Sequence, residues 1–334
     1  MDIGVLGAGT WGIALAKLLC ENRHRVTVWS ALPEEIEWLS GGHEHKNLPG
    51  VKLPRDIEYT ADIEKALGAD FVLFAVPSAF VRSTVRAASP FLREGQIIID
   101  AAKGMESETL FTMTEVIADE MKKCGCTFEP KLVALSGPTH AEEVAIGMPT
   151  SVVCACSDEE CAQSAASLFM NSCMRVYTNT DVKGVELCGA LKNIIALASG
   201  MSTGMGYGDN TRAMLITRGI AEMTRMGLAM GCKRRTFMGL AGIGDLIVTC
   251  TSQHSRNNRC GEYIGRGMTY KEASEKVGMV VEGYYALEAA VELSRKYGEP
   301  LPIISAVYDV VMNGRKPEDA LDALMTRAMR SELD

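Results

Sequence analysis

The sequence predicts an α/β fold class: a doubly wound, mostly parallel sheet in the first half of the chain and an all-α domain in the second. Short apolar runs alternate with helix-like segments over the first half, which is the pattern of doubly wound sheets. A glycine-rich turn at residues 7–12 directly follows the first of these runs. Beyond about Asn179 the β-type runs stop, and apolar residues recur with the period of a helix.

Five apolar runs are predicted to be buried strands of the sheet. Each is short and nearly continuous in apolar character, which is typical of parallel strands covered on both faces. The segments between them are long enough for crossover helices, and residues 150–156 and 174–177 are predicted to extend the sheet. The five runs are residues 2–6, 25–29, 70–76, 96–100 and 131–136.

The length of 334 residues predicts two domains, because one hydrophobic core rarely supports so long a chain. The change of pattern predicts a sheet domain over residues 1–180 and a helical domain over residues 181–334. Residues 187–201 and 280–293 are clear helices of the second domain. The small residues of the first of these helices would let the two domains pack closely, with a cleft between them.

Charge and hydropathy limit the partners of the protein. The net charge of -8 argues against an overall attraction to nucleic acid or to an anionic membrane. No apolar stretch approaches the roughly 20 residues of a membrane span, and residues 1–5 enter a strand without the basic region of a signal peptide. We therefore expect a cytoplasmic protein with no nucleic-acid partner and no membrane span.

The eleven cysteines are predicted to be reduced thiols, mostly buried. Cys124 with Cys126, and Cys154 with Cys156, form C-x-C pairs, whereas closed zinc sites use C-x₂₋₄-C. The five histidines do not cluster near them, so no metal site is expected. Cys154 and Cys156 would share one face of a strand, with Cys161 close by, and redox or metal chemistry is the alternative.

The turn at residues 7–12 predicts a Rossmann-type dinucleotide site, because it lies between a predicted strand and a predicted helix. Gly7 would allow the tight turn, Gly9 would let the backbone approach a pyrophosphate, and Gly12 would let helix and strand pack closely. The helix N-terminus then offers N–H groups and its positive dipole end to the phosphates. A glycine turn without a ligand is the alternative.

The end of the second strand, at Trp29 and Ser30, leaves the choice of NAD or NADP open. An NAD-selective site usually has Asp or Glu at this point, and an NADP site has Arg. Neither is present, and Glu34 and Glu35 follow a turn later.

Three further loops follow predicted strand ends, on the edge where doubly wound sheets bind ligands. Ser78 would cap the next helix or belong to a plain turn. Lys103 is predicted to contact a ligand, with a solvated lysine as the alternative. The segment 136–141 would offer backbone N–H groups to an anion or amide, and His140 within it is predicted to be a surface or capping residue rather than a proton carrier.

A polar loop in the second half predicts a small phosphorylated substrate. Ser255, Arg256 and Asn257 offer hydroxyl, guanidinium and amide donors to one phosphate. A solvated loop is the alternative. Asp245, which follows a run of glycines, would be a helix cap or the partner of a catalytic lysine.

Lys192 lies in the mostly apolar predicted helix 187–201. A lysine is almost never fully buried unless it is paired, so either its side chain extends to solvent or it faces an apolar cleft. In such a cleft desolvation would lower its pKa, and the amine could donate and accept a proton near neutral pH. Asn193 beside it could hold a substrate hydroxyl or phosphate oxygen.

Taken together, these motifs resemble the NAD(P)-dependent glycerol-3-phosphate dehydrogenase family of the bacterial type. They occur in the order and spacing of that family, and the resemblance covers nearly the whole chain. The motifs at residues 190–193, 239–252 and 254–259 are far more specific than the glycine turn at residues 7–12. The motifs are residues 7–12, 76–78, 101–104, 136–143, 190–193, 239–252 and 254–259, and residues 47–54 also look like the family.

The resemblance implies reversible reduction of dihydroxyacetone phosphate to sn-glycerol 3-phosphate, which feeds phospholipid synthesis. It implies that Lys192 is the general acid/base and that Lys103 contacts substrate and cofactor, with Asp245 as the third catalytic residue. The cofactor residues would be Gly7, Gly9, Thr10, Trp11, Gly12, Ser30, Lys103, Ala141, Arg256, Val280 and Glu282. The substrate residues would be Lys103, Gly137, Thr139, Lys192, Asn193, Asp245, Thr249, Ser255, Arg256 and Asn257.

The chain departs from the family at one informative position. Many members carry Arg just after the Trp that ends the second strand, where this chain has Ser30. A preference for NADP therefore does not carry over, and the expected cofactor is NAD or NADP.

The chemistry inferred from the residues agrees with the resemblance. Hydride would move between nicotinamide C4 and substrate C2, while the Lys192 ammonium protonates the developing alkoxide. Lys103 would stabilise the oxyanion and lower the pKa of Lys192, and Arg256 and Asn257 would hold the phosphate.

Two rival functions are compatible with the same motifs. One is a related two-domain dehydrogenase of a 3-hydroxy acid or a ketopantoate-like substrate. The other is a catalytically silent dinucleotide sensor, which would have no need of both lysines and Asp245. The expected partner is the small phosphorylated substrate, and a homodimer is the assembly to test.

Overall fold

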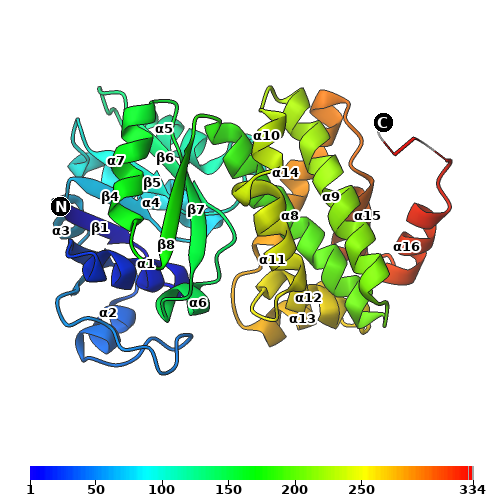
Figure 1. The fold of residues 1–334 in the computed structure, drawn as a ribbon, viewed down its shortest axis with the longest axis horizontal. Coiled ribbons are helices and arrows are strands. Elements are labelled where there is room, and N and C mark those ends of the chain that lie inside the picture. Colours follow the sequence, from blue (N-terminus) through cyan, green and yellow to red (C-terminus); the bar gives the residue numbers. More distant parts are fainter. Residues whose placement is uncertain (330, 333–334) are drawn as a thin grey trace.

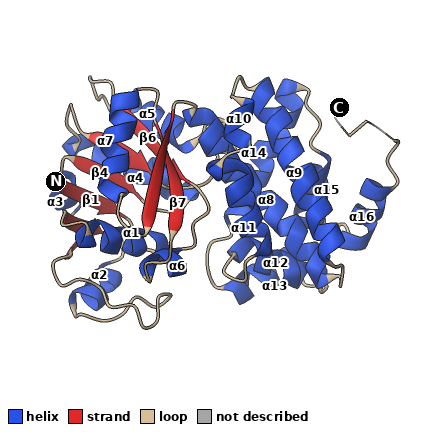
Figure 2. Ribbon diagram, viewed as in Figure 1, coloured by secondary structure: helices blue, strands red, loops and turns tan. Residues whose placement is uncertain are grey.

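The computed structural model describes residues 1–329 and 331–332, and it has two halves side by side (Figure 1). The first half is a sheet covered by helices on both faces, and the second consists of helices (Figure 2). The predicted fold class is therefore confirmed. No described helix is both long enough and apolar enough to cross a membrane.

The sheet has eight strands in the order β3-β2-β1-β4-β5-β6-β7-β8. Neighbouring strands are parallel except β6 and β7, which are antiparallel. The order reverses beside β1, and at such a point the loops at the carboxyl ends separate to leave a crevice. The strands are β1 (Asp2–Leu6), β2 (Arg25–Trp29), β3 (Glu58–Thr60), β4 (Phe71–Phe74), β5 (Ile97–Asp100), β6 (Lys131–Ser136), β7 (Thr150–Ala155) and β8 (Met174–Asn179).

All seven predicted strands are present, and among the described residues β3 is the one strand that was not predicted. The strands alternate their side chains between two cores. Leu73 packs into the core beneath the helices that follow β1 and β7, whereas Val72 and Phe74 face the core on the opposite side. The helices of this half are α1 (Thr10–Glu21), α2 (Pro33–Ser40), α3 (Ile63–Leu67), α4 (Val81–Ala88), α5 (Met113–Lys123), α6 (Ala141–Ala145) and α7 (Glu159–Phe169), with 3₁₀ turns η1 (Ser78–Phe80) and η2 (Ser89–Phe91).

After β8 the described chain contains helices and no further strand, as predicted. The helix α8 is the axis of this half, and its residues 184–202 are all buried. The helices are α8 (Val182–Gly204), α9 (Asp209–Ala229), α10 (Arg234–Phe237), α11 (Asp245–Thr251), α12 (Arg256–Gly265), α13 (Tyr270–Val277), α14 (Glu282–Tyr297), α15 (Pro302–Asn313) and α16 (Pro317–Met325), with the π-helical turn η3 (Leu240–Gly244) before α11.

Small residues of α8 bring it against α12 rather than chiefly against the first half. A Cβ on Gly200 would lie 2.0 Å from the Asn258 carbonyl oxygen, so only glycine permits this approach. The expectation that the small residues serve packing between the domains is thus wrong for most of the helix. Gly189 is the exception, since a Cβ there would lie 3.4 Å from Cγ of Lys103.

Two glutamates join the halves, the buried Glu186 and the half-buried Glu282. Glu186 of α8 accepts hydrogen bonds from the Thr114 amide and the Thr112 hydroxyl, each at 2.8 Å, at the start of α5. Glu282 of α14 accepts the Ser78 amide at 3.1 Å and also the Ser78 hydroxyl. Ser78 therefore does not cap a helix with its side chain. Its hydroxyl ties the two halves together instead.

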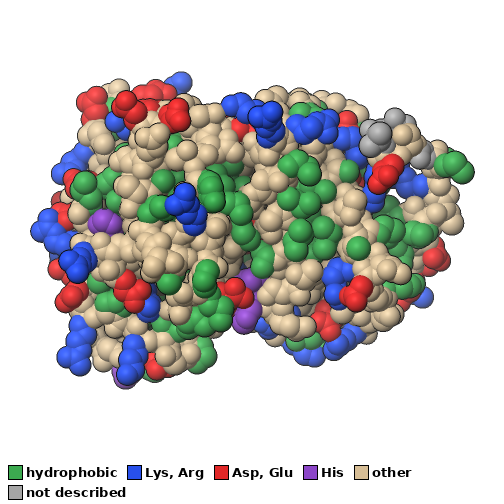
Figure 3. All heavy atoms as spheres, viewed as in Figure 1, with side chains coloured by type: hydrophobic (Ala, Val, Ile, Leu, Met, Phe, Trp, Pro, Cys, Tyr) green, Lys and Arg blue, Asp and Glu red, His purple; other side chains and the backbone are tan. Residues whose placement is uncertain are grey.

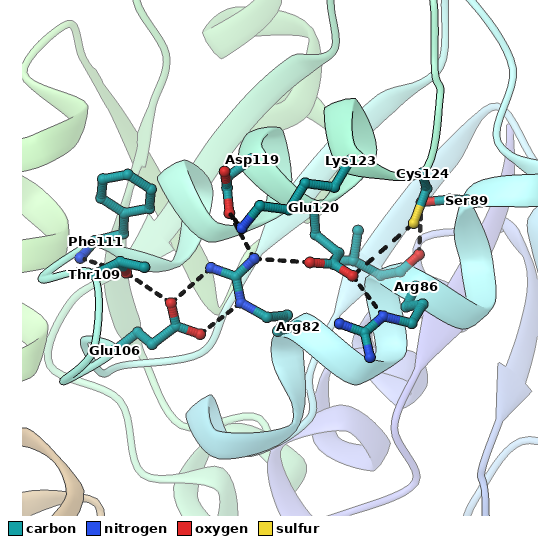
Figure 4. A network of polar contacts seen from close by, with 11 residues as sticks. Arg82, Arg86, Ser89, Glu106, Thr109, Phe111, Asp119, Glu120, Lys123 and Cys124 are labelled. Atoms are coloured by element: carbon teal, nitrogen blue, oxygen red, sulfur yellow. Dashed lines mark hydrogen bonds and ion pairs between the residues drawn. The ribbon is translucent and has the colours of Figure 1, made fainter.

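The loop that carries Lys103 is anchored by a network of charged side chains (Figure 4). Arg82 of α4 donates to both carboxylate oxygens of Glu106, at 2.7 and 2.6 Å, and to Asp119 of α5 at 2.6 Å. Glu106 lies three residues beyond Lys103. Because Arg82 binds Glu106 in a bidentate manner, the loop is fixed to two helices of the sheet domain.

All eleven cysteines lie among the described residues and are free thiols, and seven of them are buried. Cys154 and Cys156 pack in the same core, as predicted for residues on one face of a strand. The described residues contain no group of three or more His, Cys, Asp or Glu that could hold a metal ion.

Candidate active site

A cavity of about 210 Å³ lies where the carboxyl ends of the central strands meet the helical half. The halves meet at a waist in the space-filling view (Figure 3). The sheet domain contributes the loops after β1, β4, β5 and β6, and the helical half contributes α8, α11, the start of α12 and the start of α14. The predicted cleft between the domains is therefore present.

The glycine turn has the backbone that a dinucleotide site needs. Gly7 has φ +122°, a conformation that other residues rarely adopt. A Cβ on Gly12 would lie 2.0 Å from the Gly7 carbonyl oxygen, whereas a Cβ on Gly9 would meet nothing within 4 Å. The buried Nε1 of Trp11 lines the cavity and has no hydrogen-bond partner among the described residues. Open backbone and an unused donor fit a bound dinucleotide.

Two lysines share one aspartate at the base of the cavity. Lys192 Nζ lies 2.5 Å from Asp245 Oδ1 and 2.8 Å from Thr249 Oγ1. Lys103 Nζ lies 2.9 Å from the other carboxylate oxygen of Asp245 and 3.0 Å from the Gly137 carbonyl oxygen. Asp245 starts α11 but does not cap it with its side chain, so it is the partner of the lysines.

The charges at this site are unusual because they are buried. Lys192 is 4% exposed and Asp245 is 0% exposed. Desolvation lowers the pKa of Lys192 to about 7; the Lys103 charge also lowers it, and Asp245 opposes both effects. Burial alone would raise the pKa of Asp245, but the two lysines hold it below its usual value. Near neutral pH, Lys192 can therefore exist in both protonation states.

A chain of amides runs from the lysines towards α14. Asn193 Nδ2 donates to the Gly189 carbonyl oxygen at 3.2 Å, and its Oδ1 accepts Asn257 Nδ2 at 3.0 Å. The Oδ1 of Asn257 accepts the Gly283 amide at 2.8 Å. These bonds fix the orientation of both asparagine side chains beside the cavity.

The polar loop predicted to hold a phosphate forms the start of α12. The Ser255 hydroxyl caps this helix by accepting the Asn258 amide at 3.2 Å. Arg256 is the first residue of the helix; it is exposed and lines the cavity. A helix N-terminus beside a guanidinium group offers several donors to an anion.

His140 occupies the N-cap position of α6, as expected, but its side chain lies in the cavity wall rather than at the surface. The side chain makes no capping bond to α6 within the described structure, and its Nε2 is buried without a partner there. Burial and the nearby Lys192 lower the pKa of His140, so its imidazole is neutral at pH 7. Its ring lies 5.6 Å from that of His254.

Most residues that the sequence singled out line the cavity. Six do not. Gly7 and Gly12 pack against each other within the glycine turn. The Gly137 carbonyl oxygen accepts a hydrogen bond from Lys103, and the buried Asp245 pairs with both lysines. Ser30 lies past the end of β2, and Val280 follows the lining residue Met279. The residues in the wall are Gly9, Thr10, Trp11, Lys103, Thr139, Ala141, Lys192, Asn193, Thr249, Ser255, Arg256, Asn257 and Glu282.

The sequence reasoning assigned no binding role to two kinds of lining residue, although most of them lie in segments that it singled out as motifs. The apolar ones follow β4 and β5 or, in the case of Met279, precede α14, and their side chains carry no chemical signal that would single them out. The polar ones are histidines and a glutamate near the predicted anion loops. The missed residues are Ala75, Val76, Pro77, Ala101, Ala102, His140, Glu142, His254 and Met279.

Comparison with known proteins agrees with this geometry. Residues 2–162 match the family model of the NAD-dependent glycerol-3-phosphate dehydrogenase N-terminus, and residues 181–322 match that of its C-terminus. A glycerol-3-phosphate dehydrogenase [NAD(P)+] of Lactobacillus delbrueckii subsp. bulgaricus is 56% identical over 99% of this chain and 98% of its own length. Its counterpart from Agathobacter rectalis is 48% identical over 99% and 97%.

Solved structures lead to the same family. A crystal structure of glycerol-3-phosphate dehydrogenase from Coxiella burnetii has a TM-score of 0.92 and 33% identity, covering 98% of this chain and 99% of that one. A ketopantoate reductase from Ralstonia eutropha has a TM-score of 0.60 at 17% identity, covering 96% of this chain and 100% of that one, and so shares the fold alone. The full-length matches show that this chain belongs to the NAD-dependent glycerol-3-phosphate dehydrogenase family.

Proposed function

We propose that the protein catalyses the reversible reduction of dihydroxyacetone phosphate to sn-glycerol 3-phosphate, with NAD or NADP as the cofactor. The observation that carries the proposal is the buried group of Lys192, Lys103 and Asp245, placed at the cavity between the glycine turn and the anion loop. Membership of the family supports the same reaction.

The residues divide the reaction between them. Bound reduced nicotinamide supplies the hydride to C2 of the substrate. Lys192 gives a proton to the C2 oxygen during reduction and takes it back during oxidation, which its pKa of about 7 permits. Lys103 stabilises negative charge on that oxygen, and Asp245 holds both ammonium groups in place.

The remaining polar groups would orient the substrate. Arg256 and Asn257 hold the phosphate at the start of α12, and Asn193 holds a substrate hydroxyl. Binding energy from the phosphate, remote from C2, is then used to position the reacting carbon. On the cofactor side, the glycine turn holds the pyrophosphate, and Trp11 and Glu282 line the adjoining wall.

Turnover with alternative substrates tests the proposal. Oxidation of the reduced cofactor, followed by its absorbance, is expected with dihydroxyacetone phosphate and not with ketopantoate or a 3-oxo acid. Absence of turnover with dihydroxyacetone phosphate in folded protein would reject the proposal. Turnover with ketopantoate instead would support the rival dehydrogenase, and cofactor binding without any turnover would support a dinucleotide sensor.

The wider setting follows from the same family. We propose that the product feeds phospholipid synthesis, that the enzyme acts in the cytoplasm and that it is a homodimer. Light scattering of the purified protein at micromolar concentration tests the assembly, and a monomeric mass would exclude the dimer.

Arg256→Ala is expected to raise the KM for dihydroxyacetone phosphate by about 10- to 100-fold, because a charged hydrogen bond contributes about 1.5–3 kcal/mol. The kcat should change much less, since the guanidinium would bind the phosphate rather than the reacting carbon. Steady-state kinetics separates the two constants. Arg259→Ala, in the same helix but outside the cavity wall, is the matched control. An unchanged KM in Arg256→Ala would exclude the phosphate role.

The pH dependence of the two directions should mirror the protonation of Lys192. Desolvation lowers its pKa to about 7, so the ammonium needed for reduction is lost above that pH. We expect kcat/KM for reduction to fall by about tenfold per pH unit above pH 7, and kcat/KM for oxidation to rise with pH and level off there. Profiles in both directions measure this.

Lys103→Met is the control for this profile. It removes a charge that lowers the pKa of Lys192, so the inflection should move to higher pH. An inflection that stays in place would show that another group carries the proton.

A further inference from the structure

The choice between NAD and NADP, open in the sequence, depends on the residues just beyond β2. The Gly7 amide donates to the Trp29 carbonyl oxygen at 2.8 Å, so the end of β2 lies against the dinucleotide turn. Ser30 follows directly and is 5% exposed. In doubly wound dehydrogenases, the group at this point meets the adenosine ribose and decides between a 2′-hydroxyl and a 2′-phosphate.

Ser30 brings a carboxylate to this position. Its hydroxyl oxygen accepts the Leu32 amide at 3.1 Å and donates to Glu35 Oε2 at 2.7 Å. Because the amide occupies the oxygen, the hydroxyl proton is directed at Glu35. The carboxylate of Glu35, which belongs to the first turn of α2, is thereby held at the end of β2. It takes the place of the Asp or Glu that the sequence lacks there.

The start of α2 is also poorly suited to a phosphate. Pro33, its first residue, has no N–H to donate. The Leu32 amide is already bound to Ser30, and the Glu35 amide donates to the Leu32 carbonyl oxygen at 3.1 Å. The carboxylate of Glu35 is held in this turn by Ser30, whereas Glu34 beside it is exposed to solvent. A 2′-phosphate, with a charge of about −1.5 to −2, would meet this negative charge.

The basic groups near this turn offer little positive charge to a 2′-phosphate. Burial lowers the pKa of His45, so its imidazole is neutral at pH 7, although Glu35 acts against this shift. Lys46 is exposed on the same loop, where its ammonium is solvated. An arginine, the residue that binds a 2′-phosphate in a bidentate manner, is absent from residues 26–54.

We propose that Ser30 and Glu35 together make the enzyme selective for NAD(H) over NADP(H). Glu35 accepts a hydrogen bond from the ribose 2′-hydroxyl and repels a 2′-phosphate, and Ser30 acts as the positioning residue for its carboxylate. The inference rests on the proposed function, because it assumes that a dinucleotide binds along the glycine turn.

Calorimetric titration of the enzyme with NADH and with NADPH, without substrate, tests the inference. We expect NADH to bind at least about tenfold more tightly than NADPH. Glu35→Gln should reduce this ratio to about threefold or less, mainly because NADPH binds more tightly once the repulsion is gone. Ser30→Ala should reduce it less, since the carboxylate remains but is no longer held.

Glu34→Gln is the matched control, because it removes the same charge from the neighbouring, exposed position. The ratio of NADH affinity to NADPH affinity in Glu34→Gln should stay close to that of the unmodified enzyme at the same ionic strength. Equal binding of both cofactors, an unchanged ratio in Glu35→Gln, or an equal effect of Glu34→Gln would each overturn the inference.

The two proposals fail in different experiments. Turnover of dihydroxyacetone phosphate at equal efficiency with NADH and NADPH would leave the proposed function intact and reject the selectivity. Preferential binding of NADH without any turnover of dihydroxyacetone phosphate would support the selectivity and reject the proposed function.

Discussion

Lys192→Met is expected to lower kcat for dihydroxyacetone phosphate reduction by about a thousandfold, within the range of general acid–base catalysis. Methionine keeps the length and the apolar packing of the lysine stem but has no proton to transfer. Because the Lys192 ammonium binds Asp245 and Thr249 of α11 and no residue of the glycine turn, the dissociation constant of NADH should change by no more than about threefold. Steady-state kinetics in both directions and a fluorescence titration with NADH measure the two effects.

Lys183→Met is the matched control for this variant. Lys183 lies on the same helix, pairs with Glu115 at 2.7 Å, and its side chain is 41% exposed. Removing such an exposed pair should leave kcat nearly unchanged. If Lys192→Met instead lost NADH binding and folding stability together, the lysine would be structural. If it kept most of its turnover, the proton would come from another titratable group in the cavity wall, such as Lys103 or His140.

The strands could be predicted because of where they lie in the sheet. Runs such as Ile97–Asp100 are buried on both faces, and the continuous apolar pattern that burial requires is visible in the sequence. Glu58–Thr60 escaped prediction because it is a three-residue edge strand with no buried residue. It is a strand because its backbone pairs with β2, and the pattern of its side chains does not indicate that pairing.

The proposed catalytic residues were predictable where a residue conflicts with its surroundings. Lys192 is a charge within an apolar helix, and Lys103 follows a buried strand at the ligand edge of the sheet. Asp245 remained undecided between a cap and a lysine partner, because it lies 53 residues beyond Lys192. Sequence separation of that size says nothing about distance. Only the packing of α11 against α8 brings the carboxylate between the two lysines.

The residues that sequence reasoning missed or misplaced owe their place to local backbone geometry. His140 precedes a short helix, as a capping residue would, but its ring turns into the cavity towards His254. Glu35 follows Ser30 by five residues, which is no recognised spacing for either a helix or a strand. The turn at Leu32 and Pro33 folds the carboxylate back towards β2, and no periodic pattern encodes such a turn.

Asp245→Asn is expected to be as damaging to the fold as to the reaction. The aspartate is fully buried and neutralises two lysines, so its loss leaves uncompensated buried charge. Removing one partner of a buried pair costs about 3–5 kcal/mol of the free energy of unfolding. The Asp245 charge also raises the pKa of Lys192, so that pKa should fall further and the proton donor would be lost at neutral pH. Urea unfolding and steady-state kinetics measure the two losses.

The pH dependence of the free energy of unfolding shows which buried charge accounts for the loss of stability in Asp245→Asn. Asp245 has a lowered pKa in the folded protein, so its stabilising contribution is present at neutral pH and is lost as the pH falls through the lowered pKa. Lys192 acts in the same sense over a different range: between pH 7 and its usual 10.5 the folded state binds fewer protons than the unfolded state, so stability rises with pH there as well. In Asp245→Asn the acid-side loss should disappear, while the rise on the alkaline side should persist.

A double-mutant cycle with Lys192→Met decides whether the pair itself is responsible. Once Lys192 is absent, loss of Asp245 leaves only Lys103 unpaired, and the second substitution should cost less by about 2 kcal/mol. Asp209→Asn is the control, since it breaks an aspartate–arginine pair whose carboxylate is 95% exposed and should change the free energy of unfolding little. Additive effects of Lys192→Met and Asp245→Asn would mean that Asp245 stabilises the fold through contacts other than the lysines, and its role in holding the proton donor would then have to be abandoned.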